Sequence, residues 1–167
     1  GINNLFYFDV DKEFDATKTG ELITCDAIHL SGGNTYYFLD ALKRRGLLPL
    51  LKKFVEKDGI LIGVSAGSII MSKTIAVTQI DDDLGGDQNE VGIEDLTALG
   101  LTDFEFFPHF NKASTEIEER LKEYSKRVIS IIYACSDGDG IVVDGDKIEF
   151  LGNVKKIENG EMGICIK

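Results

Sequence analysis

Basic side chains are scarce in this sequence. Its 167 residues include 18 Lys and Arg against 29 Asp and Glu, which gives a formal net charge of −11. The densest basic cluster is the three-residue run 43–45, and so short a run is typical of the C-terminal end of a helix. A chain without a basic patch has little with which to neutralise phosphate groups. We therefore expect neither a nucleic acid nor an anionic membrane surface as partner.

Cysteines and long apolar runs are also few. Cys25, Cys135 and Cys165 are far apart and form no Cys-x-x-Cys pair, so they predict neither a zinc site nor a disulfide framework. Free thiols at this frequency suit the reducing cytosol. No stretch reaches the roughly 18 apolar residues that a membrane span needs, and the sequence does not open on a signal-peptide pattern. We expect a soluble cytoplasmic protein with no metal, no cofactor and no membrane partner.

The pattern that is present predicts an α/β fold. Length and composition indicate a single domain over residues 1–167 with a sizeable core. Strands are expected at 5–10, 26–30, 60–64, 74–79 and 104–107, helices at 35–45, 48–57 and 114–127, and a loop at 81–90. Five short strands follow at 128–135, 140–143, 147–151, 154–157 and 163–166. The order predicts an open three-layer α/β sandwich, mostly parallel, with a C-terminal antiparallel extension.

The most informative stretch is 60–70, Ile-Leu-Ile-Gly-Val-Ser-Ala-Gly-Ser-Ile-Ile. An apolar strand runs into Gly-x-Ser-x-Gly at 63–67 and then into a helix, which is the context of a nucleophile elbow. The glycines avoid a clash where the backbone reverses. Ser65 would stand at the end of a strand beside N–H donors that could stabilise an oxyanion. The alternative is a strand-to-helix turn in which small residues serve packing alone.

A serine nucleophile needs a base, and this chain has two histidines. His29 lies in the middle of a predicted strand, where a structural role is expected. His109 follows Pro108 at a strand end, and therefore at the sheet edge that also carries Ser65. Elimination favours His109 as the base, and a loop histidine that only caps or packs is the alternative.

The acid that orients this histidine could come from either of two places in the sequence. Asp137 follows the predicted strand 128–135 directly, again at a strand end. Asp81, Asp82 and Asp83 lie between Ser65 and His109 in an acidic loop, and one of them could reach the histidine if the loop folds over the site. Runs of this kind are more often solvated surface. An α/β-hydrolase is disfavoured because no histidine follows position 109.

A second glycine turn, Ser-Gly-Gly-Asn-Thr at 31–35, also joins a strand to a helix. Its free N–H groups could supply an oxyanion donor beside the Ala66 N–H. The alternative is a plain turn before a helix capped by Asn34. Because the turn lacks the Gly-Lys-Ser/Thr of a P-loop, it gives little support for nucleotide binding.

Gly-Gly-Asn-Thr at 32–35, Gly-Val-Ser-Ala-Gly at 63–67 and Pro-His-Phe at 108–110 together resemble peptidase family S51, which contains dipeptidase E and cyanophycinase. The resemblance covers roughly residues 22–145. It implies a fold like that of class I glutamine amidotransferases, with serine in place of cysteine. It also implies a triad of Ser65, His109 and an acid, with Asp137 favoured and Asp81 second. Gly33 and Ala66 match the oxyanion donors, and Asn34 lies beside them in the substrate-binding turn.

Two departures from the family pattern stand out. The resemblance implies an arginine early in the helix after the histidine, but this sequence has Ile117 at that position. Arg120 is the nearby residue that could replace the arginine. The chain also begins at what resembles the second strand of the family, so the first strand and helix are expected to be missing. A sheet without that strand would expose an edge or pair with another chain, which makes a homodimer possible.

The expected function is therefore a serine peptidase that hydrolyses short peptides, similar to dipeptidase E. One alternative is a non-catalytic member of the fold that binds a small ligand or a partner. Another is an amidase or esterase that uses the same site, since the acyl-transfer groups are shared and specificity lies in the pocket.

Overall fold

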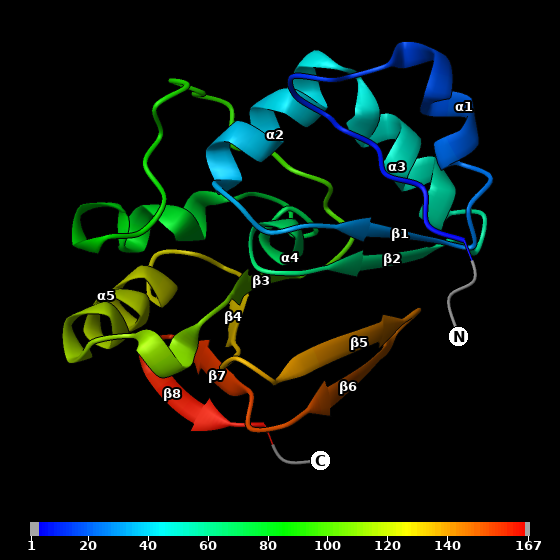
Figure 1. The fold of residues 1–167 in the computed structure, drawn as a ribbon. Helices are drawn as coiled ribbons and strands as arrows, with labels where there is room; N and C mark the ends of the chain where they lie inside the picture. Colours follow the sequence, from blue (N-terminus) through cyan, green and yellow to red (C-terminus); the bar gives the residue numbers. More distant parts are fainter. Residues whose placement is uncertain (1–3, 166–167) are drawn as a thin grey trace.

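The computed structural model describes residues 4–165 and contains two pairs of parallel strands (Figure 1). β1 (Ala27–Leu30) pairs with β2 (Ile60–Gly63), and β3 (Phe104–Phe107) pairs with β4 (Ile131–Ala134). β4 continues through the antiparallel strands β7 (Lys155–Glu158) and β8 (Glu161–Ile164). β5 (Gly140–Asp144) and β6 (Lys147–Leu151) form a separate hairpin. Parallel strands thus come first along the chain and antiparallel strands last, as predicted.

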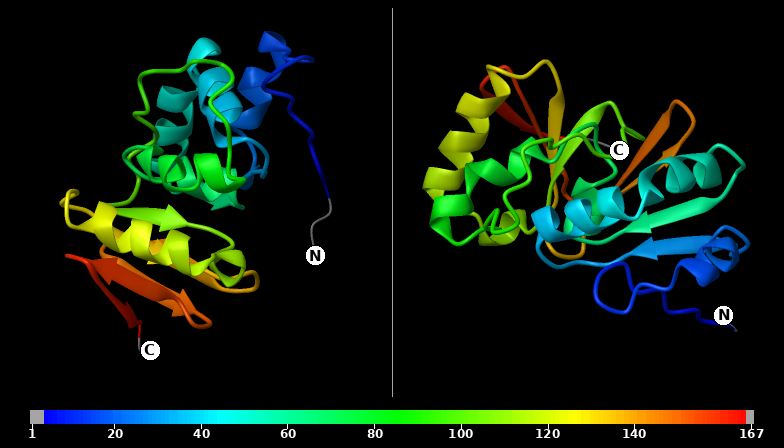
Figure 2. Two further views of the ribbon diagram at one scale, coloured as in Figure 1. Left: turned by 90° about the vertical axis from the view of Figure 1, so that its left-hand side faces the viewer. Right: turned by 90° about the horizontal axis from the view of Figure 1, so that it is seen from above.

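Three helices pack on one side of these strands. They are α2 (Thr35–Arg44), α3 (Leu47–Val55) and α5 (Thr115–Ser125). Asn34 caps α2 and Ser114 caps α5 through side-chain oxygens that accept backbone N–H groups, which explains where both helices begin. Their buried side chains join one hydrophobic core with strand residues such as Ile132. Figure 2 shows α2 and α3 over the first strand pair and α5 over the second.

The remaining helical segments are single turns: η1 (Ala16–Lys18), α1 (Thr19–Leu22), α4 (Ala66–Ile69), η2 (Ala76–Ile80), η3 (Asp82–Leu84) and η4 (Phe110–Lys112). Two of them matter for the site. α4 follows β2 directly, and η4 follows β3, so both begin at the carboxyl ends of parallel strands.

The other side of the strands is covered over one pair and open over the other. Over β3 and β4, Tyr133 packs against Phe104 and against Phe150 of β6, each pair with ring centroids 4.9 Å apart. Over β1 and β2, Ile60, Ile62 and Val64 expose 60%, 47% and 50% of their surface. The fold is the predicted three-layer α/β sandwich class, and in this chain the third layer is the β5–β6 hairpin.

The predicted strand at 5–10 is wrong. These residues are irregular, and they contribute side chains rather than a backbone ladder. Phe8 packs at 5.7 Å from Phe14, edge to face, and both lie against the main core. An aromatic segment can bury its rings this way without strand pairing.

The predicted strand at 74–79 is also wrong. Thr74 forms an isolated bridge with Thr97, and the chain then turns into η2. Ile75 and Val77 are fully buried, and the Thr78 hydroxyl donates to the Ile75 carbonyl at 2.7 Å. The apolar residues that suggested a strand therefore reach the core from a tight turn. Residue 166, the predicted end of the last strand, lies outside the described residues.

Candidate active site

Ser65 occupies a sharp turn between β2 and α4. Its backbone lies at φ 54° and ψ −117°, a region that L-residues rarely adopt. A Cβ at Gly63 would lie 2.7 Å from the Gly67 carbonyl carbon, and one at Gly67 would lie 2.2 Å from the Leu30 oxygen. Both glycines are thus required by close backbone approach. The packing role that the sequence suggested for these small residues is therefore present.

His109 meets Ser65 from the neighbouring strand pair. It follows β3 by two residues and also has a left-handed backbone, at φ 57°. The Phe110 N–H donates to the Cys135 carbonyl at 2.9 Å, which fixes this turn against the end of β4. The Ser65 Oγ and His109 Nε2 atoms are 2.9 Å apart. This is hydrogen-bond distance for a hydroxyl and an imidazole.

Asp137 contacts the other nitrogen of the same ring. Its Oδ1 atom lies 2.5 Å from His109 Nδ1, and it reaches this place from the segment after β4. The Lys112 ammonium and then the His109 ring lower the pKa of Asp137 to about 2. Asp137 is therefore an anion at neutral pH and can only accept hydrogen bonds. It follows that Nδ1 carries the proton of a neutral His109, and that Nε2 accepts from the Ser65 hydroxyl.

The His109 and Asp137 side chains are each 46% exposed. Solvent screens the attraction between such groups. Their orientation therefore depends on the hydrogen bonds that hold them.

Asp81, the alternative acid, lies in a different environment. Its backbone carbonyl accepts the N–H groups of Leu84 and Gly86, so it closes a turn of the acidic loop. Burial raises the pKa of the Asp81 carboxyl, and Asp87 adds to the effect. Among the described residues, the carboxylate that hydrogen-bonds His109 belongs to Asp137. The geometry joins Asp137, and not Asp81, to the histidine.

The glycine turn at 31–35 lies beside the elbow. A Cβ at Gly32 would sit 3.4 Å from the Ser65 Cβ, and Gly33 has a φ of +135° with open space around it. The Asn34 side chain is occupied, because its oxygen accepts the Tyr37 N–H at 3.0 Å and its nitrogen donates to the Gln88 carbonyl at 2.9 Å. Asn34 thus stabilises the turn through both of its side-chain polar atoms. At Gly33, no heavy atom lies within 4 Å of the position that a Cβ would take.

Sequence reasoning missed several contacts around this site. Asp87 accepts both the N–H and the hydroxyl of Thr35 at 2.6 Å, which ties the acidic loop to the start of α2. Asn111 and Lys112 both contact Asp137. The sequence offered one indication of these contacts, because both residues are close to His109 in the chain. It could not show which way their side chains point.

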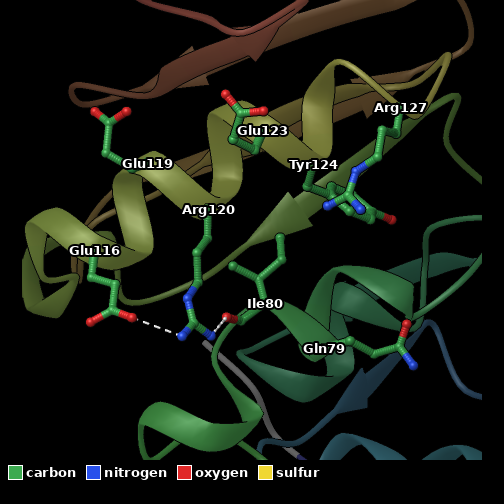
Figure 3. Close-up of a pocket in the computed structure, with 8 residues that line it drawn as sticks. All are labelled: Gln79, Ile80, Glu116, Glu119, Arg120, Glu123, Tyr124 and Arg127. Carbon is green, nitrogen blue, oxygen red and sulfur yellow. Dashed lines mark hydrogen bonds and ion pairs between the residues drawn. The ribbon is translucent and has the colours of Figure 1, made fainter.

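Arg120 is bound within the protein. Its guanidinium donates to both oxygens of Asp83, to Glu116 at 2.7 Å and to the Ile80 carbonyl at 3.1 Å. It lines a cavity of about 650 Å³ between η2 and α5, drawn in Figure 3. The other lining residues are Gln79, Ile80, Glu116, Glu119, Glu123, Tyr124 and Arg127. This cavity does not include Ser65, His109 or Asp137.

Within residues 4–165, no three or more His, Cys, Asp or Glu side chains are grouped so that they could hold a metal ion. No helix in that range is long and apolar enough to cross a membrane.

An elbow serine at the end of a parallel strand, hydrogen-bonded to a histidine from the next strand pair, places the chain among the α/β-sandwich proteins that carry a nucleophile-elbow motif. The chain matches the model of peptidase family S51 over residues 10–151. It therefore belongs to peptidase family S51, as the three motifs indicated.

Individual relatives agree with this assignment. The uncharacterized peptidase Lmo0363 of Listeria monocytogenes is 32% identical over 142 residues, 84% of this chain and 67% of that protein. Peptidase E of Shewanella amazonensis is 28% identical over 135 residues, 77% of this chain and 54% of that protein. The crystal structure of a candidate peptidase E from Listeria monocytogenes EGD-e has a TM-score of 0.71 at 28% identity, over 86% of this chain and 67% of that one. The chain thus spans about half to two thirds of the length of these relatives.

Proposed function

We propose that this protein is a serine peptidase that hydrolyses short peptides through a triad of Ser65, His109 and Asp137. The observation that carries the proposal is the continuous chain of contacts from Ser65 Oγ through both ring nitrogens of His109 to Asp137. Nucleophile, base and orienting acid are recognised by such contacts rather than by their order in the sequence.

In this mechanism the Ser65 oxygen attacks the scissile carbonyl carbon while His109 Nε2 takes the hydroxyl proton. The tetrahedral intermediate then collapses, the C–N bond breaks, and His109 gives the proton to the leaving amine. Water then attacks the carbonyl carbon of the acyl-enzyme while His109 Nε2 takes a proton from it. The ester bond to Ser65 breaks, and His109 returns the proton to the Ser65 oxygen. Asp137 holds the ring in the required tautomer and stabilises its positive charge.

The proposed oxyanion donors are the backbone N–H groups of Gly33 and Ala66. The following N–H groups of α4 already donate to the carbonyls of Val64 and Ser65. α4 is a single turn, so we assign the stabilisation to individual N–H groups rather than to a helix dipole. One such donor contributes roughly 3–4 kcal/mol in related oxyanion holes.

The substrate specificity that we propose does not require an acidic side chain. Arg120 is neutralised by Asp83 and Glu116, and Ile117 is partly buried against the core. Neither residue offers a free cation to a substrate carboxylate. Aspartyl and non-aspartyl dipeptides are therefore expected to be cleaved at comparable rates.

The test is hydrolysis of a dipeptide library together with labelling by a fluorophosphonate. We expect Ser65→Ala to abolish labelling and to lower kcat by roughly 10⁴-fold or more, and His109→Gln to reduce both strongly. Ser68→Ala, one turn along α4, and His29→Gln, on the exposed face of β1, are the matched controls. Labelling without peptide cleavage would favour an amidase or esterase. Absence of both would favour a non-catalytic binding protein.

A further inference from the structure

Three residues of the turn at 109–112 contact Asp137, namely His109, Asn111 and Lys112. His109 Nδ1 lies 2.5 Å from Oδ1, whereas Lys112 Nζ lies 2.8 Å from Oδ2. The Asn111 side-chain oxygen accepts the Asp137 backbone N–H at 2.9 Å, and its nitrogen lies 3.5 Å from Oδ2. Each carboxylate oxygen thus has its own cationic or polar partner.

This arrangement follows from the turn after β3. The left-handed backbone of His109 reverses the chain into η4, so that positions 109, 111 and 112 all face the segment after β4. The charged and polar groups that meet Asp137 are His109, Asn111 and Lys112 from this turn. On its own segment, Asp139 is engaged by the N–H groups of Ser136 and Asn153.

We propose that Asn111 and Lys112 are positioning residues that set the orientation of the Asp137 carboxylate toward His109. This inference rests on the triad proposed above. Asn111 fixes the backbone of Asp137, and Lys112 occupies Oδ2 so that Oδ1 faces the ring. Such support is needed here because the carboxylate is 46% exposed and would otherwise be free to rotate into water.

Lys112 has a second effect, through its charge. Its ammonium shares the carboxylate with the imidazole, and it therefore opposes a positive charge on that ring. Removal of the ammonium removes this opposition, while Asn111 still holds the backbone of Asp137 beside the ring. The acid limb of the pH profile of kcat/KM is then expected to move to higher pH in Lys112→Met.

The two residues are distinguished by opposite shifts. Lys112→Met keeps the side-chain length and removes the charge, so the His109 ring signals are expected to titrate at higher pH by NMR than in the wild type. Asn111→Ala loosens Asp137, so the His109 signals are expected to titrate at lower pH and kcat to fall roughly tenfold with KM little changed. Lys112→Arg restores the wild-type midpoint. A His29→Gln background leaves His109 as the one histidine to observe.

Several outcomes would decide the matter. If both variants lower thermal stability but leave the His109 titration in place, the two residues are merely structural and the proposal is wrong. If Asn111→Ala does not fold, Lys112→Met carries the test, because the Lys112 side chain is 65% exposed. Opposite titration shifts in a protein that cleaves no peptide would support the positioning role and overturn the peptidase. Ser65-dependent cleavage with unmoved titrations would do the reverse.

Discussion

The turn around Ser65 requires glycine at positions 63 and 67, because backbone atoms stand where a side chain would be. Gly67→Ala would place a methyl group 2.2 Å from the Leu30 carbonyl oxygen, and backbone cannot yield there as a side-chain tip can. We expect a loss of roughly 1–3 kcal/mol in unfolding free energy together with loss of fluorophosphonate labelling at Ser65. Because the chain has no tryptophan, unfolding is best followed by circular dichroism.

Gly20→Ala is the matched control for this prediction. It lies in α1, where an added Cβ meets nothing within 4 Å, and a helical alanine is expected to be neutral or slightly stabilising. Equal effects of the two substitutions would contradict the steric argument.

At the residue scale, the contact between Ser65, His109 and Asp137 could be predicted because each residue follows a strand, and strand ends share one sheet edge. Asp81 could not be excluded from sequence, since the path of the acidic loop is set by long-range contacts such as Asp87 with Thr35. The contacts of Lys112 depend on the left-handed φ of His109, which the sequence does not reveal.

A buried carboxylate couples β3 to α5. Glu105 is 4% exposed and accepts the Tyr124 hydroxyl at 2.9 and 3.2 Å. Burial raises the pKa of Glu105 above its ordinary value of 4.5, and the Tyr124 hydrogen bond opposes the shift. The folded state thus holds this proton more tightly than the unfolded state does. Stability is expected to fall as the pH rises from about 4.5 through the higher folded pKa.

Glu105→Gln tests this coupling. The amide removes the buried charge and still accepts from Tyr124, so the variant is expected to be more stable than the wild type at neutral pH and to lose that pH dependence. Tyr124→Phe leaves the carboxylate without its donor and is expected to cost about 1–3 kcal/mol. Both are measured by urea unfolding between pH 4 and 8. A wild-type curve that rises with pH over this range, with no gain in Glu105→Gln, would contradict the assignment.

At the element scale, the sequence predicted the helices best. α2 and α5 have side-chain caps at Asn34 and Ser114 and clear apolar stripes, and such local features are visible in sequence. The strands predicted at 5–10 and 74–79 were wrong because a short β-branched or aromatic run does not show whether a partner strand exists. Tertiary burial of Phe8 and Val77 decided those segments instead.

At the scale of the whole molecule, the side of β1 and β2 opposite the helices is left open by the residues that the structure describes. Ile60, Ile62 and Val64 lie together on the open side of β1 and β2 and are about half exposed. Ala27 and His29 of β1, which pair in register with Ile60 and Ile62, lie on the same side. Contiguous apolar surface of this kind favours association. The homodimer expected from an exposed sheet edge stays a prediction, and this open face is a separate surface through which two copies could associate.

We expect the wild-type chain to self-associate with rising concentration in sedimentation velocity and to bind a hydrophobic dye. Ile62→Lys places a charge in the centre of the face and is expected to shift the protein toward monomer and to lower dye binding, with Ser65 labelling retained. Ile129→Lys is the control, because Ile129 is fully exposed but stands alone in a turn far from this face in the chain. A wild type that stays monomeric at high concentration, or equal effects of the two substitutions, would show that the open face does not drive association.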